Sequence, residues 1–313
     1  MATPARQGHV LVIGASGLDI IGRPLGPVQV GTSTPGYLRA APGGVARNIA
    51  ENLAHLGMDV VLITAVGEDR QGRQLLEETA ETGVNVEHVL IVPGQHTGAY
   101  LAVLDSQGRI QLALDDMRVM DMLTPEYIRE CRNLFEEAAA VVLDANLPVK
   151  TLGAIVSLAR RNGVPVAADP TSVSLAPRLA PLLKNLWLVV CNEAEVEALC
   201  PGTPPPPQGE RSTDCPRRLV SLGVEIAIVS HAEFGVGYAT VDVSGRVPEI
   251  KTEIIDPTGA GDALTAAVIF GLLNDIPLDE AVRLGVSAAA LTLRSRGSVA
   301  PDLSLESLYE QLR

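Results

Sequence analysis

The stretch Asp256-Pro257-Thr258-Gly259-Ala260-Gly261-Asp262 holds the residue types that a phosphoryl transfer requires. Residues 263–273 follow it as an uncharged run of helix formers, which predicts a buried helix that begins at the glycines. Free N–H groups at a helix start attract phosphate, and glycines let the backbone approach it. A carboxylate beside these donors, such as Asp262, can take the proton of an acceptor hydroxyl while the donors stabilise the moving phosphoryl group.

The alternative for Asp262 is a purely structural one, because acids stabilise the start of many helices. The whole stretch, however, resembles the second signature of the PfkB/ribokinase family of sugar and nucleoside kinases. The resemblance implies that Asp262 is the catalytic base and that the backbone of Gly259, Ala260 and Gly261 is the anion hole. It also implies that Thr258 and these glycines contact the nucleotide.

A second glycine-rich stretch opens a helix near the N-terminus. Gly43 and Gly44 precede a helical pattern that ends at Gly57, and Asn48 lies in its first turns. By residue type alone, Asn48 is a local capping amide. The stretch resembles the first PfkB signature, which implies that Gly43, Gly44 and Asn48 contact sugar hydroxyls. Two signatures in the order of the family make a chance match remote.

Length and composition fit a globular enzyme. The 313 residues suffice for one large α/β domain with an appendage or for two modest domains, and hydrophobic residues make up 47% of them. The net charge of −13, without a basic cluster, argues against a nucleic-acid partner. The longest apolar run is too short to span a bilayer, and residues 1–8 lack the apolar segment of a signal peptide. The four cysteines show no CxxC spacing, so we expect reduced thiols in a cytoplasmic protein without a membrane partner.

Apolar strands alternate with helical stretches along most of the chain. Strands separated by helices form a parallel sheet with helices on both faces. We therefore expect one α/β domain over residues 1–313, and the resemblance implies the ribokinase-like three-layer sandwich with a mostly parallel central sheet. The expected strands are residues 9–13, 60–66, 139–143, 164–168, 186–190 and 225–230. Thr124 is the expected cap of a helix that runs to about Glu137.

Two β-rich segments, about residues 20–40 and 88–118, interrupt this alternation. The second contains two runs around a turn at 105–108, which predicts a hairpin. We expect the segments to form a small sheet, the lid, over the carboxyl end of the first strand. Asp19 lies just past that strand, so it is either a ligand-binding residue or a turn residue. The resemblance favours sugar binding by Asp19 and a homodimer formed through the lid.

The cofactor assignments rest on the same resemblance. By residue type, Asn192 and Glu195 are ordinary residues of a first helical turn. The resemblance implies that Asn192 contacts phosphate and that Glu195 holds Mg²⁺ through water, which suits a cation bound mainly by substrate phosphates. It further implies ATP contacts at Ser230, Gly235 and Ser287, with Ala232 where the family usually has glycine. It finally implies a monovalent cation such as K⁺ at Asp256.

Details of the first half resemble the pseudouridine kinases within this family. They are Arg47, the turn at 91–94 that leads to Thr97, and Asp116 after the lid strand. The resemblance implies that these three side chains bind the substrate and that the chain phosphorylates the 5′-hydroxyl of pseudouridine with ATP. Arg47 could instead lie on a solvated helix face. Ribokinase, adenosine kinase and other sugar kinases of the family are alternatives, as is a catalytically silent nucleotide- or sugar-binding regulator.

Overall fold

A mostly parallel sheet forms the centre of the computed structural model, which describes residues 7–105, 107, 109–202, 211–231 and 235–313. Its strand order is β14-β13-β12-β11-β10-β9-β1-β4, and β13 and β14 alone run antiparallel to their neighbours within it. The strands are β1 (His9–Ile13), β4 (Val60–Ile63), β9 (Ala138–Asp144), β10 (Val166–Asp169), β11 (Leu188–Asn192), β12 (Ile226–His231), β13 (Gly235–Ala239) and β14 (Ser244–Val247).

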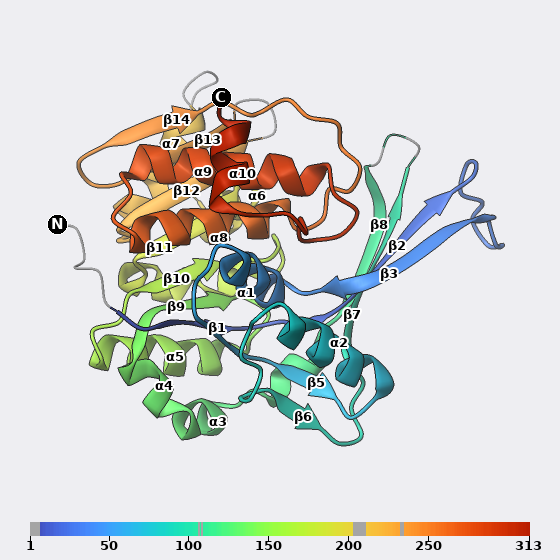
Figure 1. Ribbon diagram of the computed structural model, residues 1–313, viewed down its shortest axis with the longest axis horizontal. Helices are drawn as coiled ribbons and strands as arrows, with labels where there is room; N and C mark the ends of the chain where they lie inside the picture. The colour runs from blue at the N-terminus through green and yellow to red at the C-terminus, as the bar shows by residue number, and fades with distance from the viewer. Residues whose placement is uncertain (1–6, 106, 108, 203–210, 232–234) are drawn as a thin grey trace.

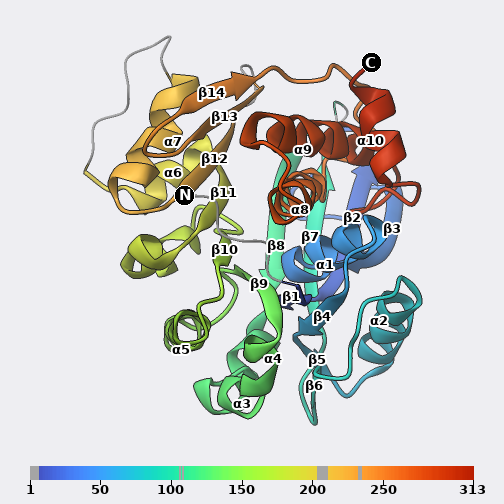
Figure 2. The same cartoon turned by 60° about the vertical axis from the view of Figure 1, so that its left-hand side comes forward.

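Helices cover both faces of this sheet, so the structure has the expected three layers (Figures 1 and 2). On one face lie α3 (Pro125–Glu130), α4 (Arg132–Glu136), α5 (Val149–Arg161), α6 (Glu193–Leu199) and α7 (Arg211–Ser221). On the other lie α1 (Val45–His55), α8 (Ala260–Leu273), α9 (Leu278–Leu293) and α10 (Leu305–Gln311). Helix α2 (Arg70–Glu81) and the 3₁₀ turns η1 (Arg118–Met122), η2 (Ala176–Arg178) and η3 (Ala180–Asn185) complete the described helices.

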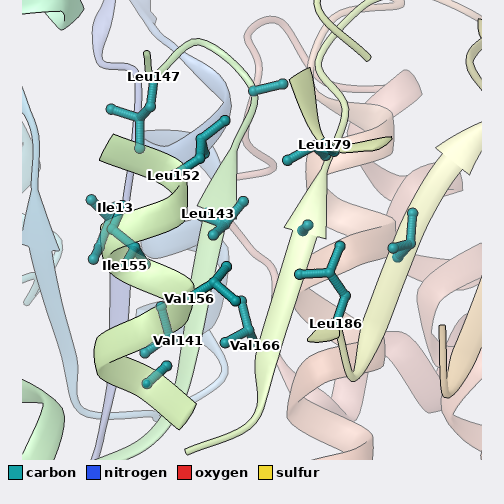
Figure 3. Close-up of a cluster of buried hydrophobic side chains, with 14 of the residues drawn as sticks. Ile13, Val141, Leu143, Leu147, Leu152, Ile155, Val156, Val166, Leu179 and Leu186 are labelled. Atoms are coloured by element: carbon teal, nitrogen blue, oxygen red, sulfur yellow. The ribbon is translucent and has the colours of Figure 1, made fainter. Parts of the chain in front are cut away.

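Each face of the sheet carries its own apolar core, because buried parallel strands are apolar on both sides. Figure 3 shows one of them, in which Leu152, Ile155 and Val156 of α5 pack against Val141 and other strand residues. All four cysteines are free thiols and buried. No described helix is long and apolar enough to cross a bilayer.

The lid is a separate four-stranded sheet that projects from the body (Figure 1). Its strand order is β3-β2-β7-β8, with bounds Gly36–Gly43, Gly17–Pro24, Gly98–Leu104 and Ile110–Asp116 in that order. Residues in register across a sheet share a face. Ala41, Asp19, Tyr100 and Asp115 form one such row on the face that carries Asp19.

Glycines lie where three of the lid strands join the body. Gly17 pairs with Gly43 on one side and with Gly98 on the other. A Cβ on Gly17 would lie 2.5 Å from the carbonyl oxygen of Gly98, and a Cβ on Gly98 would lie 2.5 Å from the sulfur of Met117. The root of the lid is therefore a row of residues without side chains, packed too closely to accept one.

The run 60–66 is two strands, which corrects the prediction of one. Strand β4 pairs with β1 in the central sheet. Strand β5 (Ala65–Gly67) instead pairs with β6 (Leu90–Val92) in a two-stranded sheet. Both halves are fully buried, so their hydrophobicity is the same and only the pairing partner changes, at Thr64. Residues 90–92, within the second predicted lid segment, thus belong to another sheet.

Two further expectations differ from the structure. The helix predicted from Thr124 to Glu137 ends at Glu130, and a second helix begins at Arg132 after Cys131. Strands β13 and β14 and helix α7 have no counterpart in the prediction, because short glycine-containing strands and a helix with an internal proline, Pro216, give weak patterns. Ala232, part of the turn at 105–108 and most of the proline-rich run at 201–208 lie outside the described residues.

Candidate active site

The backbone at the start of α8 is closely packed at Gly259 and accessible at Gly261. Gly259 is the N-cap residue with φ 79°, and a Cβ there would lie 1.8 Å from the carbonyl oxygen of Ser298. A side chain is therefore excluded by conformation and by space. A Cβ at Gly261, in contrast, would meet nothing within 4 Å, so this backbone faces open space. Ala260 begins a helix buried along almost its whole length, which fixes the direction of its dipole.

Asp262 lies in the first turn of α8 and is only 8% exposed. Its Oδ2 accepts a hydrogen bond of 2.7 Å from Nδ2 of Asn48, in α1. Burial raises the pKa of Asp262 to about 7, with Asp19 and other carboxylates adding to the shift and the Asn48 hydrogen bond opposing it. A carboxyl group that titrates near neutral pH, held in one orientation, is suited to act as a general base.

The two segments that carry Asp19 and Asn48 meet at the glycine loop. A Cβ on Gly43 would lie 2.2 Å from the carboxyl carbon of Asp19, so only glycine lets β3 approach this acid. Gly44 is the N-cap of α1 with φ 96°, and its Cβ would lie 2.5 Å from the carbonyl oxygen of Ala15. Burial raises the pKa of Asp19 to about 6, and the positive charge of Arg47 opposes this shift.

A cavity of about 190 Å³ lies beside Asp262 at the carboxyl ends of β10, β11 and β12. Parallel α/β sheets bind ligands at this edge. It brings together several predicted residues from distant parts of the chain: Asn192, Glu195, Ser230, Gly261 and Asp262. Its other lining residues are Val45, Asp169, Thr171, Val190, Cys191 and Leu264.

Asn192 and Glu195 form a reciprocal capping box at the start of α6. The Asn192 side chain accepts from the Glu195 backbone N–H at 3.0 Å, and Oε2 of Glu195 accepts from the Asn192 backbone N–H at 2.9 Å. Burial raises the pKa of Glu195, against these hydrogen bonds. The cap fixes the Glu195 carboxylate at the cavity wall, so the structural and functional interpretations of this pair are compatible.

Two buried carboxylates of the site, Asp144 and Asp169, lie outside the motifs recognised in the sequence. Asp144 accepts from the backbone N–H groups of Ala15 (2.7 Å) and Ala46 (3.1 Å), and so joins the loop after β1 to the start of α1. Asp169 lines the cavity, and burial together with Asp262 and Glu195 raises its pKa well above the usual range. Each is the last residue of a buried strand, which is the one signal that could have found them.

Several predicted residues lie away from this cavity. Thr97 donates to Oδ1 of Asp69 at 2.7 Å and accepts from the Gly67 backbone N–H at 3.1 Å. Ser287 is buried and donates to the carbonyl oxygen of Leu308 at 2.8 Å. Gly235, with φ 78°, begins β13 against β14, where a Cβ would lie 2.2 Å from the carbonyl oxygen of Val247.

Asp116 occupies the lid face opposite to Asp19. It is exposed and binds Arg118 through two hydrogen bonds of 2.7 and 2.6 Å. Its neighbour Asp115 shares the row of Asp19 and Tyr100. The register places the Tyr100 ring and both acids on the same face of the lid, and burial together with Asp19 and Asp115 raises the pKa of Tyr100.

The pfkB family of carbohydrate kinases matches residues 7–304. The pseudouridine kinase of Escherichia coli K12 is 32% identical over 96% of both chains. The chain belongs to the pfkB family. It is also 29% identical to a guanosine-inosine kinase of Exiguobacterium acetylicum, over 92% of this chain and 95% of that one. The ribokinase of Arabidopsis thaliana, solved with ribose and ATP, superposes with a TM-score of 0.85 over 98% and 99% of the chains at 22% identity, which confirms the ribokinase-like fold.

In this PfkB-family kinase Arg47 is buried, so the solvated alternative is wrong. Its side chain is 5% exposed and forms an ion pair with Glu51 one turn along α1. It also donates to Thr79 Oγ1 and to Asn48 Oδ1, both at 3.3 Å. Because Arg47 binds the oxygen of the Asn48 amide, the Nδ2 group of that amide is left to face Asp262.

Asp256 begins the stretch 256–262 that leads into α8, and it is buried. Its Oδ1 accepts from the backbone N–H of Thr258 at 3.1 Å and from Thr258 Oγ1 at 2.6 Å. Its Oδ2 accepts from Nη2 of Arg39, in the lid strand β3, at 2.5 Å. The lid and the helix start are thus joined through one carboxylate.

Proposed function

We propose that this kinase transfers the γ-phosphoryl group of ATP to the 5′-hydroxyl of pseudouridine. The observation that carries the proposal is the Asn48–Asp262 hydrogen bond at the start of α8, which orients a base with a pKa of about 7 beside open backbone N–H groups. The similarity to the Escherichia coli pseudouridine kinase supports the choice of nucleoside.

The chemistry follows from the placement of these groups. Asp19 and the Gly43–Gly44 loop bind the ribose hydroxyls, with Asn48 beside them. Asp262 accepts the proton of the 5′-hydroxyl as the oxygen attacks the γ-phosphorus, and the bond to the β–γ bridging oxygen breaks. The backbone of Gly259, Ala260 and Gly261 then stabilises the negative charge of the transferring group. The nucleobase extends over the lid face that carries Tyr100.

Mg²⁺ fits the residues present near the cavity. No group of three or more His, Cys, Asp or Glu side chains within the described residues could hold a metal alone. Magnesium in kinases is bound largely by phosphate oxygens and water, with one or two carboxylates. Glu195 would hold it through water, with Asn192 beside the phosphates, and the ion would neutralise charge on the triphosphate.

The proposal extends to assembly and location. The lid face opposite to Asp19 exposes Leu38, Leu112 and Leu114 by 79%, 54% and 64%. A second copy of the chain would cover these side chains, which supports a homodimer through the lid. The free cysteines are consistent with a cytoplasmic location.

A coupled ADP-release assay tests the substrate. Pseudouridine, uridine, guanosine, inosine, adenosine, ribose and fructose are compared by kcat/KM with ATP and Mg²⁺. Pseudouridine is expected to give the highest value. A purine nucleoside or free ribose that exceeds it by about tenfold (about 1.4 kcal/mol) would exclude pseudouridine as the preferred substrate. If none of these acceptors raises ADP release above background, the result would contradict kinase activity itself.

A further inference from the structure

Asp256 already holds three hydrogen bonds from the chain's own groups. Its side chain is 6% exposed, and Thr258 occupies one oxygen while the Arg39 guanidinium occupies the other. A buried carboxylate requires a positive partner or several donors, because the desolvated charge is otherwise costly. Arg39 supplies that partner in this structure.

This arrangement does not fit the monovalent cation that the sequence resemblance implies at Asp256. A cation such as K⁺ would have to bind Oδ2 beside Arg39, which already holds a full positive charge at 2.5 Å from this oxygen. Two cations on one buried carboxylate repel each other strongly at such distances. The guanidinium therefore excludes a second cation from this oxygen.

Arg39 reaches Asp256 from the lid. It lies on β3, in register with Ile21 and on the same lid face as Asp19, two residues before Ala41. The contact therefore exists only while the lid lies over the start of α8. Thr258, held by the other oxygen of Asp256, directly precedes Gly259, so lid position and anion-hole geometry are linked through one side chain.

We propose that Arg39 is a positioning residue that takes the place of a monovalent cation at Asp256 and orders the start of α8 when the lid is closed. The inference rests on the proposed kinase function. It predicts that turnover does not depend on monovalent cations, and that removal of Arg39 creates such a dependence.

Arg23 provides a matched control. It lies on the adjacent lid strand β2 and donates to the backbone carbonyl of Ile255, the residue before Asp256. Arg23→Ala removes a positive charge and a contact between lid and body at nearly the same place, but it leaves the Asp256 carboxylate covered by Arg39.

The experiment compares the wild type, Arg39→Ala, Arg39→Lys and Arg23→Ala. ADP release is measured in potassium, sodium and choline chloride at constant ionic strength. Wild-type turnover is expected to change by less than about twofold, and Arg39→Ala in choline to lose about 10- to 100-fold, with partial recovery in K⁺. Arg39→Lys keeps the charge and should retain most activity without a response to K⁺. Arg23→Ala should also show no response.

Melting temperatures without substrates provide a second readout. K⁺ is expected to stabilise Arg39→Ala but neither the wild type nor Arg23→Ala. A strong K⁺ activation of the wild type, or an Arg39→Ala variant that responds like Arg23→Ala, would overturn the proposal. If no protein releases ADP with any acceptor, the kinase function fails, and the melting temperatures alone then decide the role of Arg39.

Discussion

Replacement of Asp262 by asparagine separates its chemical role from its structural one. Asparagine has nearly the same shape, and its Oδ1 can still accept the hydrogen bond from Asn48 Nδ2. The general base is lost, so kcat should fall by about 100- to 10,000-fold while KM for ATP changes little. The same substitution should change stability with a definite dependence on pH.

The stability effect follows from the pKa of Asp262. Burial raises the pKa from 3.8 to about 7, so the unfolded chain loses this proton at lower pH than the folded chain. The contribution of Asp262 to the free energy of unfolding of the wild type therefore falls as pH rises from about 4 to about 7, by on the order of 4 kcal/mol at most. Asp262→Asn removes the penalty, so the variant should gain more stability relative to the wild type at pH 8 than at pH 5.

Chemical denaturation at pH 5 and pH 8, together with ADP release, measures both effects. Asp275→Asn is the control, because Asp275 is exposed just after α8 and its left-handed backbone, φ 57°, accepts asparagine. The control should leave turnover and the pH dependence of stability unchanged. A loss of kcat below about tenfold in Asp262→Asn would show that positioning dominates the chemistry. A variant no more stable than the wild type at pH 8 would refute the argument from burial.

Gly43→Ala should raise KM for the nucleoside by more than about tenfold and leave KM for ATP unchanged, because its Cβ would collide with the Asp19 carboxylate; equal effects on both KM values would contradict this. Arg47→Ala should raise the nucleoside KM by about tenfold, because the Asn48 amide loses the hydrogen bond that orients it, and should also destabilise the fold. Unchanged KM values for both substrates would argue against a role of Arg47 in the site. Asp115→Asn should alter discrimination between nucleosides, measured as a ratio of kcat/KM values, while Asp116→Asn should not; the reverse result would place the substrate on the other lid face.

The signatures predicted that glycines open α8 and that Asp262 lies in its first turn, because glycines at a helix start and a carboxylate in its first turn have a local physical meaning. Asp262 and Asn48 were predicted for separate roles, and the hydrogen bond between them depends on packing of α1 against α8 that no local pattern encodes. Asp144 and Asp169 were missed because an acid at the end of an apolar run looks like the start of any loop.

The alternating layers of the fold were predictable from apolar runs, whereas strand partners were not. The run 60–66 has uniform hydrophobicity, and its division between two sheets depends on which strands lie beside it. For the same reason the sequence did not indicate that Asp115 and Asp116 lie on opposite faces of the lid. The face that each side chain occupies follows from its register with β7, and a shift of one residue exchanges the two.

We expect the glycine row at the root of the lid to act as a hinge for this sheet. Glycine has the widest backbone freedom, so a bend costs least along the line through Gly17, Gly43 and Gly98. Displacement of a stiff plate grows with distance from its axis. Asp19, close to that line, would move little when the lid swings, while Arg39 and Arg23 farther along the strands would move most. In the proposed function, the ribose site at Asp19 would therefore keep its shape as the nucleoside enters, and the contacts of the lid with Asp256 and Ile255 would break first.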